Sequence, residues 1–153
     1  MSMTDTQPQF VLQKIYVKDL SFETPNSPQV FLEKWEPDIS LQLGNKASSL
    51  DETTHEVVLE VTVTAKLKDK TAFLVEVQLA GIFNISGYDQ PQLAAVTGSA
   101  CPQVLFPYAR EVVSDLVTRG GFPQLLLTPI NFEALYRQHL EQGNAGQTGE
   151  SKH

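Results

Sequence analysis

The sequence predicts an α+β domain in which strands come first along the chain and helices follow. Residues 55–67 alternate apolar and polar side chains, which is the period of a half-buried strand, and the alternation resumes over residues 73–79. Beyond Gly87, apolar residues recur at helical spacing instead. Because the helices follow the strands and do not alternate with them, a parallel sheet is not expected.

The clearest element is a pair of strands at the centre of the chain. Its apolar positions are Val57, Leu59, Val61, Val63, Ala65 and Leu67, then Phe73, Val75, Val77 and Leu79. The polar stretch Lys68–Lys70 separates the two runs and reads as a turn. We therefore expect an antiparallel hairpin with one buried and one solvated face.

Two further strands are expected before this hairpin. One alternating stretch runs from Trp35 to Leu43, and Pro37 predicts an irregular start or an edge position. Phe10–Leu20 is a fourth strand, although both of its faces mix apolar and polar residues. Between these strands, the two prolines of Glu23–Pro28 (ETPNSP) favour a long crossover loop.

Two helices are expected in the second half. The first has the apolar positions Phe106, Ala109, Val112 or Val113, Leu116 and Val117, and ends at Gly120 and Gly121. Pro102 and Pro107 cannot both lie inside one straight helix, so a kink or a broken start is expected. The second begins at Asn131, a good N-cap, and should bury Phe132, Leu135, Tyr136 and Leu140.

Composition limits the function classes. The chain has 153 residues, enough for one domain, and its apolar runs, such as Leu125–Leu127, are too short to cross a bilayer. Met1–Gln9 is polar without a signal-like apolar stretch, so a cytoplasmic protein is expected. The net charge of −7 argues against nucleic acid or anionic membrane as the main partner. We expect a disordered terminus over 1–9, one domain over 10–142 and a flexible tail over 143–153.

The sequence shows no pattern typical of a catalytic or metal site. His55, His139 and His153 lie far apart, no phosphate-binding loop occurs, and no cofactor is expected. Cys101 reads as a small buried hydrophobe, although a nucleophilic pair of Cys101 with His139 stays open because such partners meet only in the fold. The protein is therefore expected not to be an enzyme.

Two surfaces are candidates for binding. On the solvated face of the second hairpin strand, Glu76 lies with Leu74 and Ile82, a mixture suited to a basic, partly apolar segment. Periodicity alone assigns a second set to the core, but part of that set could line a groove for unfolded chains: Trp35, Ile39, Leu41, Leu43, Phe132 and Tyr136.

Four blocks of the sequence carry a resemblance to a known family. They are IYVKDLSFETPN at 15–26, CPQVLFPYARE at 101–111, GFPQL at 121–125 and PINFEAL at 129–135. In this order and at these separations, they resemble the SecB family of protein-export chaperones over nearly all of residues 10–140.

The resemblance implies a SecB-like fold, with a four-stranded antiparallel sheet and two helices packed on one face, assembled as a homotetramer from a dimer of dimers. It implies an ATP-independent holdase that keeps secretory precursors unfolded and delivers them to the export ATPase SecA. The basic, zinc-bearing tail of SecA would dock on Asp19, Glu23, Leu74 and Glu76, with the zinc belonging to SecA. Precursors would bind in apolar grooves that include the six residues of the second candidate surface.

Two alternatives to this function stay open. A SecB-like chaperone could serve another client, such as an antitoxin. A small α+β enzyme could use Cys101 as its nucleophile.

Overall fold

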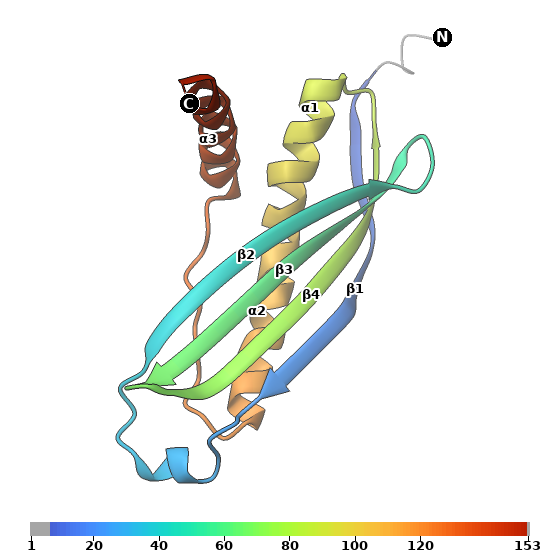
Figure 1. Ribbon diagram of the computed structural model, residues 1–153. Helices are drawn as coiled ribbons and strands as arrows, with labels where there is room; N and C mark the ends of the chain where they lie inside the picture. Colours follow the sequence, from blue (N-terminus) through green and yellow to red (C-terminus); the bar gives the residue numbers. More distant parts are fainter. Residues whose placement is uncertain (1–6, 153) are drawn as a thin grey trace.

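One antiparallel sheet forms the centre of the molecule, as expected (Figure 1). The computed structural model describes residues 7–152, and side chains as far as Gly143. The strands are β1 (Gln9–Glu23), β2 (Asp38–Ser49), β3 (Thr54–Leu67) and β4 (Lys70–Ser86), in the order β1-β4-β3-β2. Strands β1 and β2 are therefore the two edges of the sheet, and the predicted α+β class is confirmed.

The predicted antiparallel hairpin is confirmed as β3 and β4, and its apolar face is buried. Val61 pairs with Val77, Val63 with Val75, and all ten of its predicted apolar positions are buried. Lys68, with φ of 56°, makes the turn between the strands. Strand β4 runs beyond the alternating residues 73–79, to Ser86.

The mixed faces of β1 have a structural cause. Its pairing with β4 shifts register twice, between Leu12 and Lys14 and between Val17 and Asp19. Each shift is a β-bulge, which inserts one extra residue and reverses the alternation of the following side chains. A simple period-two pattern therefore cannot describe this strand.

A cluster of aromatic rings holds the crossover segment to the sheet. The segment contains a short 3-10 helix, η2 (Gln29–Leu32), and β2 begins only after Pro37. The fully buried ring of Phe73 lies 6.0 Å from that of Phe22, 6.3 Å from that of Trp35 and 5.1 Å from that of Phe122. Strand β1, the crossover and the segment after the long helix thus meet on one side chain.

The helical layer begins earlier than expected. A short helix that the sequence pattern missed, α1 (Gln90–Ala95), starts with a capping box between Asp89 and Gln92. It continues through a π-helical turn, η3 (Val96–Ala100), into α2 (Cys101–Arg119). The π turn is the expected irregular start: Pro102 follows it in the first turn of α2, while Pro107 lies inside the helix.

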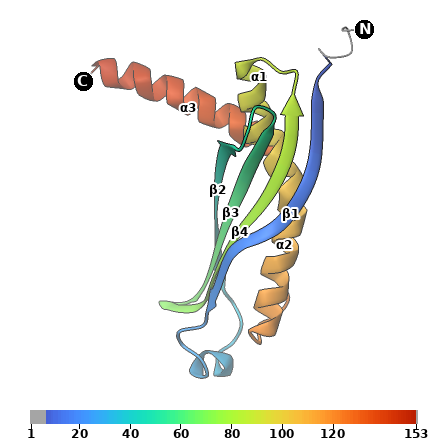
Figure 2. The ribbon, with the colours of Figure 1, turned by 90° about the vertical axis from the view of Figure 1, so that its right-hand side faces the viewer.

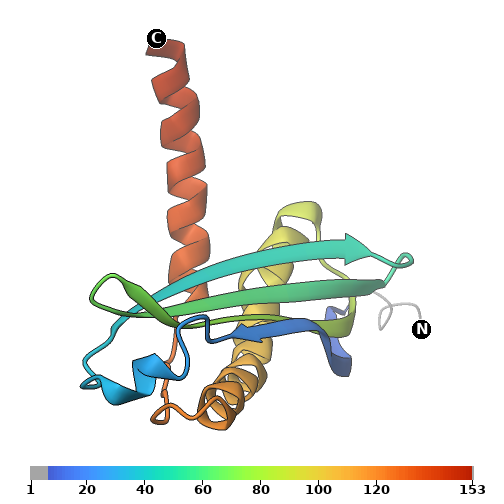
Figure 3. The same ribbon diagram turned by 60° about the horizontal axis from the view of Figure 1, so that its bottom comes forward.

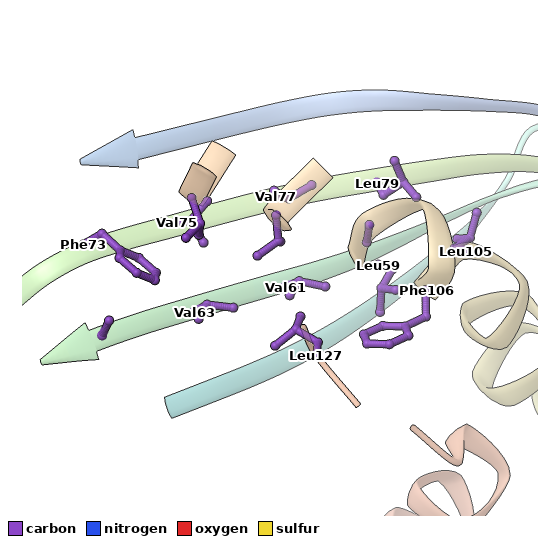
Figure 4. Packing of buried hydrophobic residues seen from close by; sticks show 14 of the residues in the cluster. Leu59, Val61, Val63, Phe73, Val75, Val77, Leu79, Leu105, Phe106 and Leu127 are labelled. Carbon is purple, nitrogen blue, oxygen red and sulfur yellow. The ribbon is translucent and has the colours of Figure 1, made fainter. Parts of the chain in front are cut away.

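Helix α2 covers one face of the sheet (Figures 2 and 4). It buries Leu105, Phe106, Ala109, Val113 and Val117 against the apolar side chains of β3 and β4. Gly81 allows this close approach, because a Cβ there would lie 2.8 Å from Leu105 Cδ2. The opposite face of the sheet is left open to solvent.

The second long helix, α3 (Phe132–Lys152), begins as predicted, with Asn131 Oδ1 accepting a hydrogen bond from Ala134 N at 3.0 Å. It then projects away from the sheet (Figure 3). Phe132 is buried, but Leu135 and Leu140 are exposed, so the prediction that they are buried is wrong.

Helix α3 also runs through most of the segment expected to be a flexible tail. The division of the chain into 1–9, 10–142 and 143–153 stays a prediction, and residues 1–6 and 153 lie outside the described residues. No helix in the described part of the chain is long and apolar enough to cross a membrane.

Candidate functional site

The open face of the sheet, which we call the docking face, carries the four predicted docking residues. Leu74 and Glu76 point outward because they alternate with the buried Phe73, Val75 and Val77 along β4. The docking face extends onto β1, where Glu23 is in register with Leu74 and Ser21 with Glu76.

Asp19 and Glu76 line the same depression, of about 200 Å³. A third acid of this depression, Glu60 of β3, was not among the predicted residues; it lies in one row with Asp19 and Gln78. Glu60 accepts a hydrogen bond from Gln78 Nε2 at 3.3 Å, and Lys46 Nζ lies 3.9 Å from its Oε2. The polar alternation of β3 was the signal that could have identified Glu60.

A charged cluster lies beside this depression on the same face. Glu56 of β3 accepts hydrogen bonds from Tyr16 Oη and from Lys18 Nζ, the latter at 2.9 and 3.1 Å to its two carboxylate oxygens. These bonds, with that from Tyr16 first, hold the pKa of Glu56 below its ordinary value, while the bond to Glu56 raises the pKa of Tyr16. Glu56 is therefore a carboxylate at neutral pH.

On the opposite side of the sheet, an apolar depression of about 470 Å³ lies between β2, η3 and the start of α3. It brings together Leu43, Phe132 and Tyr136, three of the six predicted groove residues. Gly98 in η3 lets the Tyr136 ring lie against the backbone, because a Cβ there would lie 2.5 Å from Tyr136 Cε1. Asn45 of β2 donates a hydrogen bond to the Thr97 carbonyl oxygen at 3.0 Å and joins the strand to η3.

The other three predicted groove residues lie apart from this depression. Ile39 and Leu41 point to the helical side of β2, in register with Ala65 and Val63, yet are 40% and 38% exposed. Together with Leu43 they form what we call the β2 strip. Trp35 belongs to the aromatic cluster, where its ring lies 5.3 Å from that of Phe122.

Cys101 has the surroundings of a core residue. It is completely buried, and burial raises the pKa of its thiol to about 12. A thiol with this pKa is protonated at neutral pH and does not supply the thiolate that a nucleophilic cysteine needs.

We expect Cys101→Ala to leave the holding of an unfolded protein unchanged, because the residue contributes only packing. The refolding rate of a denatured substrate, measured with equal amounts of variant and wild type, checks this. Loss of holding by a variant whose circular dichroism and melting temperature match the wild type would assign Cys101 a chemical role.

The fold and these surfaces define a class, a small α+β binding protein with an acidic sheet face on one side and an apolar groove on the other. Residues 3–143 match the family model for SecB, described as preprotein translocase subunit SecB. The chain belongs to the SecB family of protein-export chaperones.

Individual relatives agree with the family model. The chain is 58% identical over 149 residues to the protein-export protein SecB of Nitrosococcus oceani, covering 96% of this chain and 91% of that protein. It is 57% identical to the SecB of Methylococcus capsulatus, covering 92% of each, and 51% identical to that of Marinobacter nauticus, covering 95% and 88%. These relatives favour the export chaperone over the alternatives of another client or an enzyme.

Among solved structures, the fold is similar to a SecB-like chaperone of Mycobacterium tuberculosis, solved in complex with an antitoxin peptide. The TM-score is 0.67 at 17% identity, over 84% of this chain and 94% of that one. At this identity the similarity concerns the fold alone.

Proposed function

We propose that this protein is an ATP-independent holdase that binds unfolded secretory precursors in the cytoplasm and delivers them to SecA. The observation that carries the proposal is that the two faces of one sheet carry surfaces of different chemistry. An apolar groove suits an unfolded client, while an acidic face suits a basic partner. One subunit can therefore hold a precursor and bind the export motor at the same time.

The β2 strip and the depression beside it suit an extended client. Ile39 and Leu41 offer aliphatic surface to solvent, and β2 is an edge strand whose outer backbone groups have no neighbouring strand in the sheet. An unfolded segment can gain apolar contacts and backbone hydrogen bonds there, with little demand on its sequence. A folded protein buries such segments and is not bound.

The docking face suits the basic, zinc-bearing tail that the family resemblance assigns to SecA. Asp19, Glu23 and Glu76 are exposed carboxylates, which attract a cation through solvent with a strength that salt reduces. Leu74 is half-buried among them and adds an apolar contact that salt does not weaken.

A homotetramer formed as a dimer of dimers is part of the proposal. In the single subunit, the β1 edge exposes Val11, Leu12, Val17 and Leu20, each at least 36% exposed. A long edge strand with exposed apolar side chains needs a cover to avoid uncontrolled association, and a second copy would supply one. Sedimentation of the purified protein tests the tetramer directly.

The holding activity is tested by mixing the purified protein with a denatured secretory precursor and no nucleotide. Refolding should be delayed at about one tetramer for each precursor chain, because binding sequesters the unfolded state without turnover. Unchanged refolding at excess protein, or a delay that requires ATP, would exclude the proposed holdase.

Replacing both Asp19 and Glu76 with alanine is expected to weaken binding of a zinc-loaded SecA tail peptide about tenfold. Both substitutions remove attraction for the cationic peptide, and neither touches the groove, so precursor holding should not change. Titration calorimetry at low salt measures the tail affinity. The matched control replaces Glu52 and Asp69, exposed acids in the two strand turns, which removes the same charge elsewhere.

Leu74→Ala separates the two kinds of contact, because its effect should be the same at low and high salt. If the Asp19 and Glu76 variant binds the tail no more weakly than the Glu52 and Asp69 variant does, the docking assignment is wrong.

A further inference from the structure

The bulge at Lys18 determines where Asp19 points. Val17 pairs with Leu79, whose side chain is buried beneath α2, and Asp19 pairs with the next residue of β4, Gln78, on the docking face. Strand β1 thus advances two residues while β4 advances one. In a regular strand, Val17 and Asp19 would share a face, and Asp19 would point toward the core.

The extra residue of this bulge, Lys18, is held by the third strand of the sheet. Its Nζ reaches both carboxylate oxygens of Glu56, whose side chain is only 13% exposed. Tyr16 Oη donates to the same carboxylate, and both side chains cross β4 to reach it. We call Tyr16, Lys18 and Glu56 the Glu56 clasp.

The residue of β4 that pairs with Tyr16 leaves room for this crossing. Ala80 is small, fully buried, and in register with Tyr16 on one side and Val58 on the other. The clasp therefore joins the bulged segment of an edge strand to the centre of the sheet by side chains, in addition to the backbone ladder.

We propose that the Glu56 clasp is a positioning device, which holds the β1 bulge in place so that Asp19 points into the docking face. The proposal rests on the proposed function, because it concerns the same binding of a basic peptide. Lys18, Tyr16 and Glu56 act through Asp19 and are positioning residues.

The direction in which Lys18→Met changes the affinity for the tail peptide distinguishes positioning from a simple charge effect. Lys18→Met removes a positive charge from the docking face, which by charge alone should strengthen binding of the cationic tail peptide. Positioning predicts the opposite: the dissociation constant should rise about threefold to tenfold, because the freed bulge no longer holds Asp19 in place.

Lys14→Met is the matched control. Lys14 lies on the same strand and the same face, in register with Ile82, and forms no ion pair with any described residue. The Lys14→Met variant loses the same side chain and the same charge as Lys18→Met. Its affinity for the tail peptide should therefore be equal to that of the wild type or higher.

Two further variants avoid ambiguity from a change in charge or stability. Tyr16→Phe leaves the net charge unchanged and should also weaken tail binding. Lys18→Arg can still donate to both carboxylate oxygens of Glu56, so it should keep the bulge in place and bind the tail about as the wild type does. Each protein is used as the full chain, with zinc-loaded SecA tail peptide as the probe in calorimetry. If either Lys18→Met or Tyr16→Phe fails to fold, the tail affinity of the other, compared with that of Lys18→Arg, still tests the positioning role.

The Asp19→Ala background distinguishes the two possible failures. There, Lys18→Met should cause no further weakening, because the group it positions is gone. If Asp19→Ala itself does not weaken binding, the docking assignment fails. If Asp19→Ala weakens binding but Lys18→Met strengthens it as Lys14→Met does, the positioning role is refuted and the docking face stands.

Discussion

Phe73→Ala is expected to lower the free energy of unfolding by about 3–5 kcal/mol, the range for removing a buried phenylalanine ring from a core. Phe73 is completely buried, and its ring touches those of Phe22, Trp35 and Phe122. These three come from β1, the crossover and the segment after α2. The cavity would therefore loosen three separate attachments of the chain at once.

Urea unfolding followed by the fluorescence of Trp35, the only tryptophan, measures this loss. Protein concentration must be equal in all samples, because an oligomer's apparent stability depends on it. The control is Phe31→Ala, in the same cluster but 47% exposed, which should cost about 1 kcal/mol. Equal losses in the two variants would show that Phe73 is not the centre of the cluster.

Ile39→Asp combined with Leu41→Asp is expected to reduce the affinity for unfolded precursors by about tenfold or more. Each change replaces aliphatic contact with a charge that the client would have to desolvate. Both residues are already about 40% exposed, so the fold should tolerate the change. The affinity is measured from the delay of precursor refolding as a function of chaperone concentration.

Leu50→Asp is the control for a new aspartate outside the groove. Leu50 is 56% exposed in the turn after β2, away from the β2 strip, so holding should not change. Tail binding to the docking face should also be unaffected in the groove variant. If the Ile39 and Leu41 double variant holds precursors as well as Leu50→Asp does, the β2 strip is not part of the client-binding site.

The central hairpin could be predicted from sequence because its alternation is regular and one face is fully buried. The same alternation places Leu74 and Glu76 on the open face, opposite Val75 and Val77. The N-cap at Asn131 was likewise readable, because an asparagine side chain satisfies a free backbone N–H group at a helix start. Strand alternation and helix capping were therefore sufficient where the prediction concerned residues of a single element.

The prediction was incomplete or wrong where tertiary structure decides. The sequence could not show which face of β1 is buried, because the two bulges that reverse its alternation depend on pairing with β4. Leu135 and Leu140 have helical spacing but stay 41% and 49% exposed, since α3 projects away from the sheet. Trp35 alternates with the β2 strip in sequence but lies before β2, where the crossover turns it toward Phe122.

Strands β3 and β4 carry an evolutionary constraint on length. Along each of them, successive residues serve opposite sides of the sheet, as Leu59 and Glu60 do next to the groove and the docking face. Deleting a single residue from the middle of either strand would exchange the two sides for every residue beyond it. Drift in the family should therefore change many of the amino acids in these strands while tolerating almost no insertion or deletion, and length variation should collect in the turns.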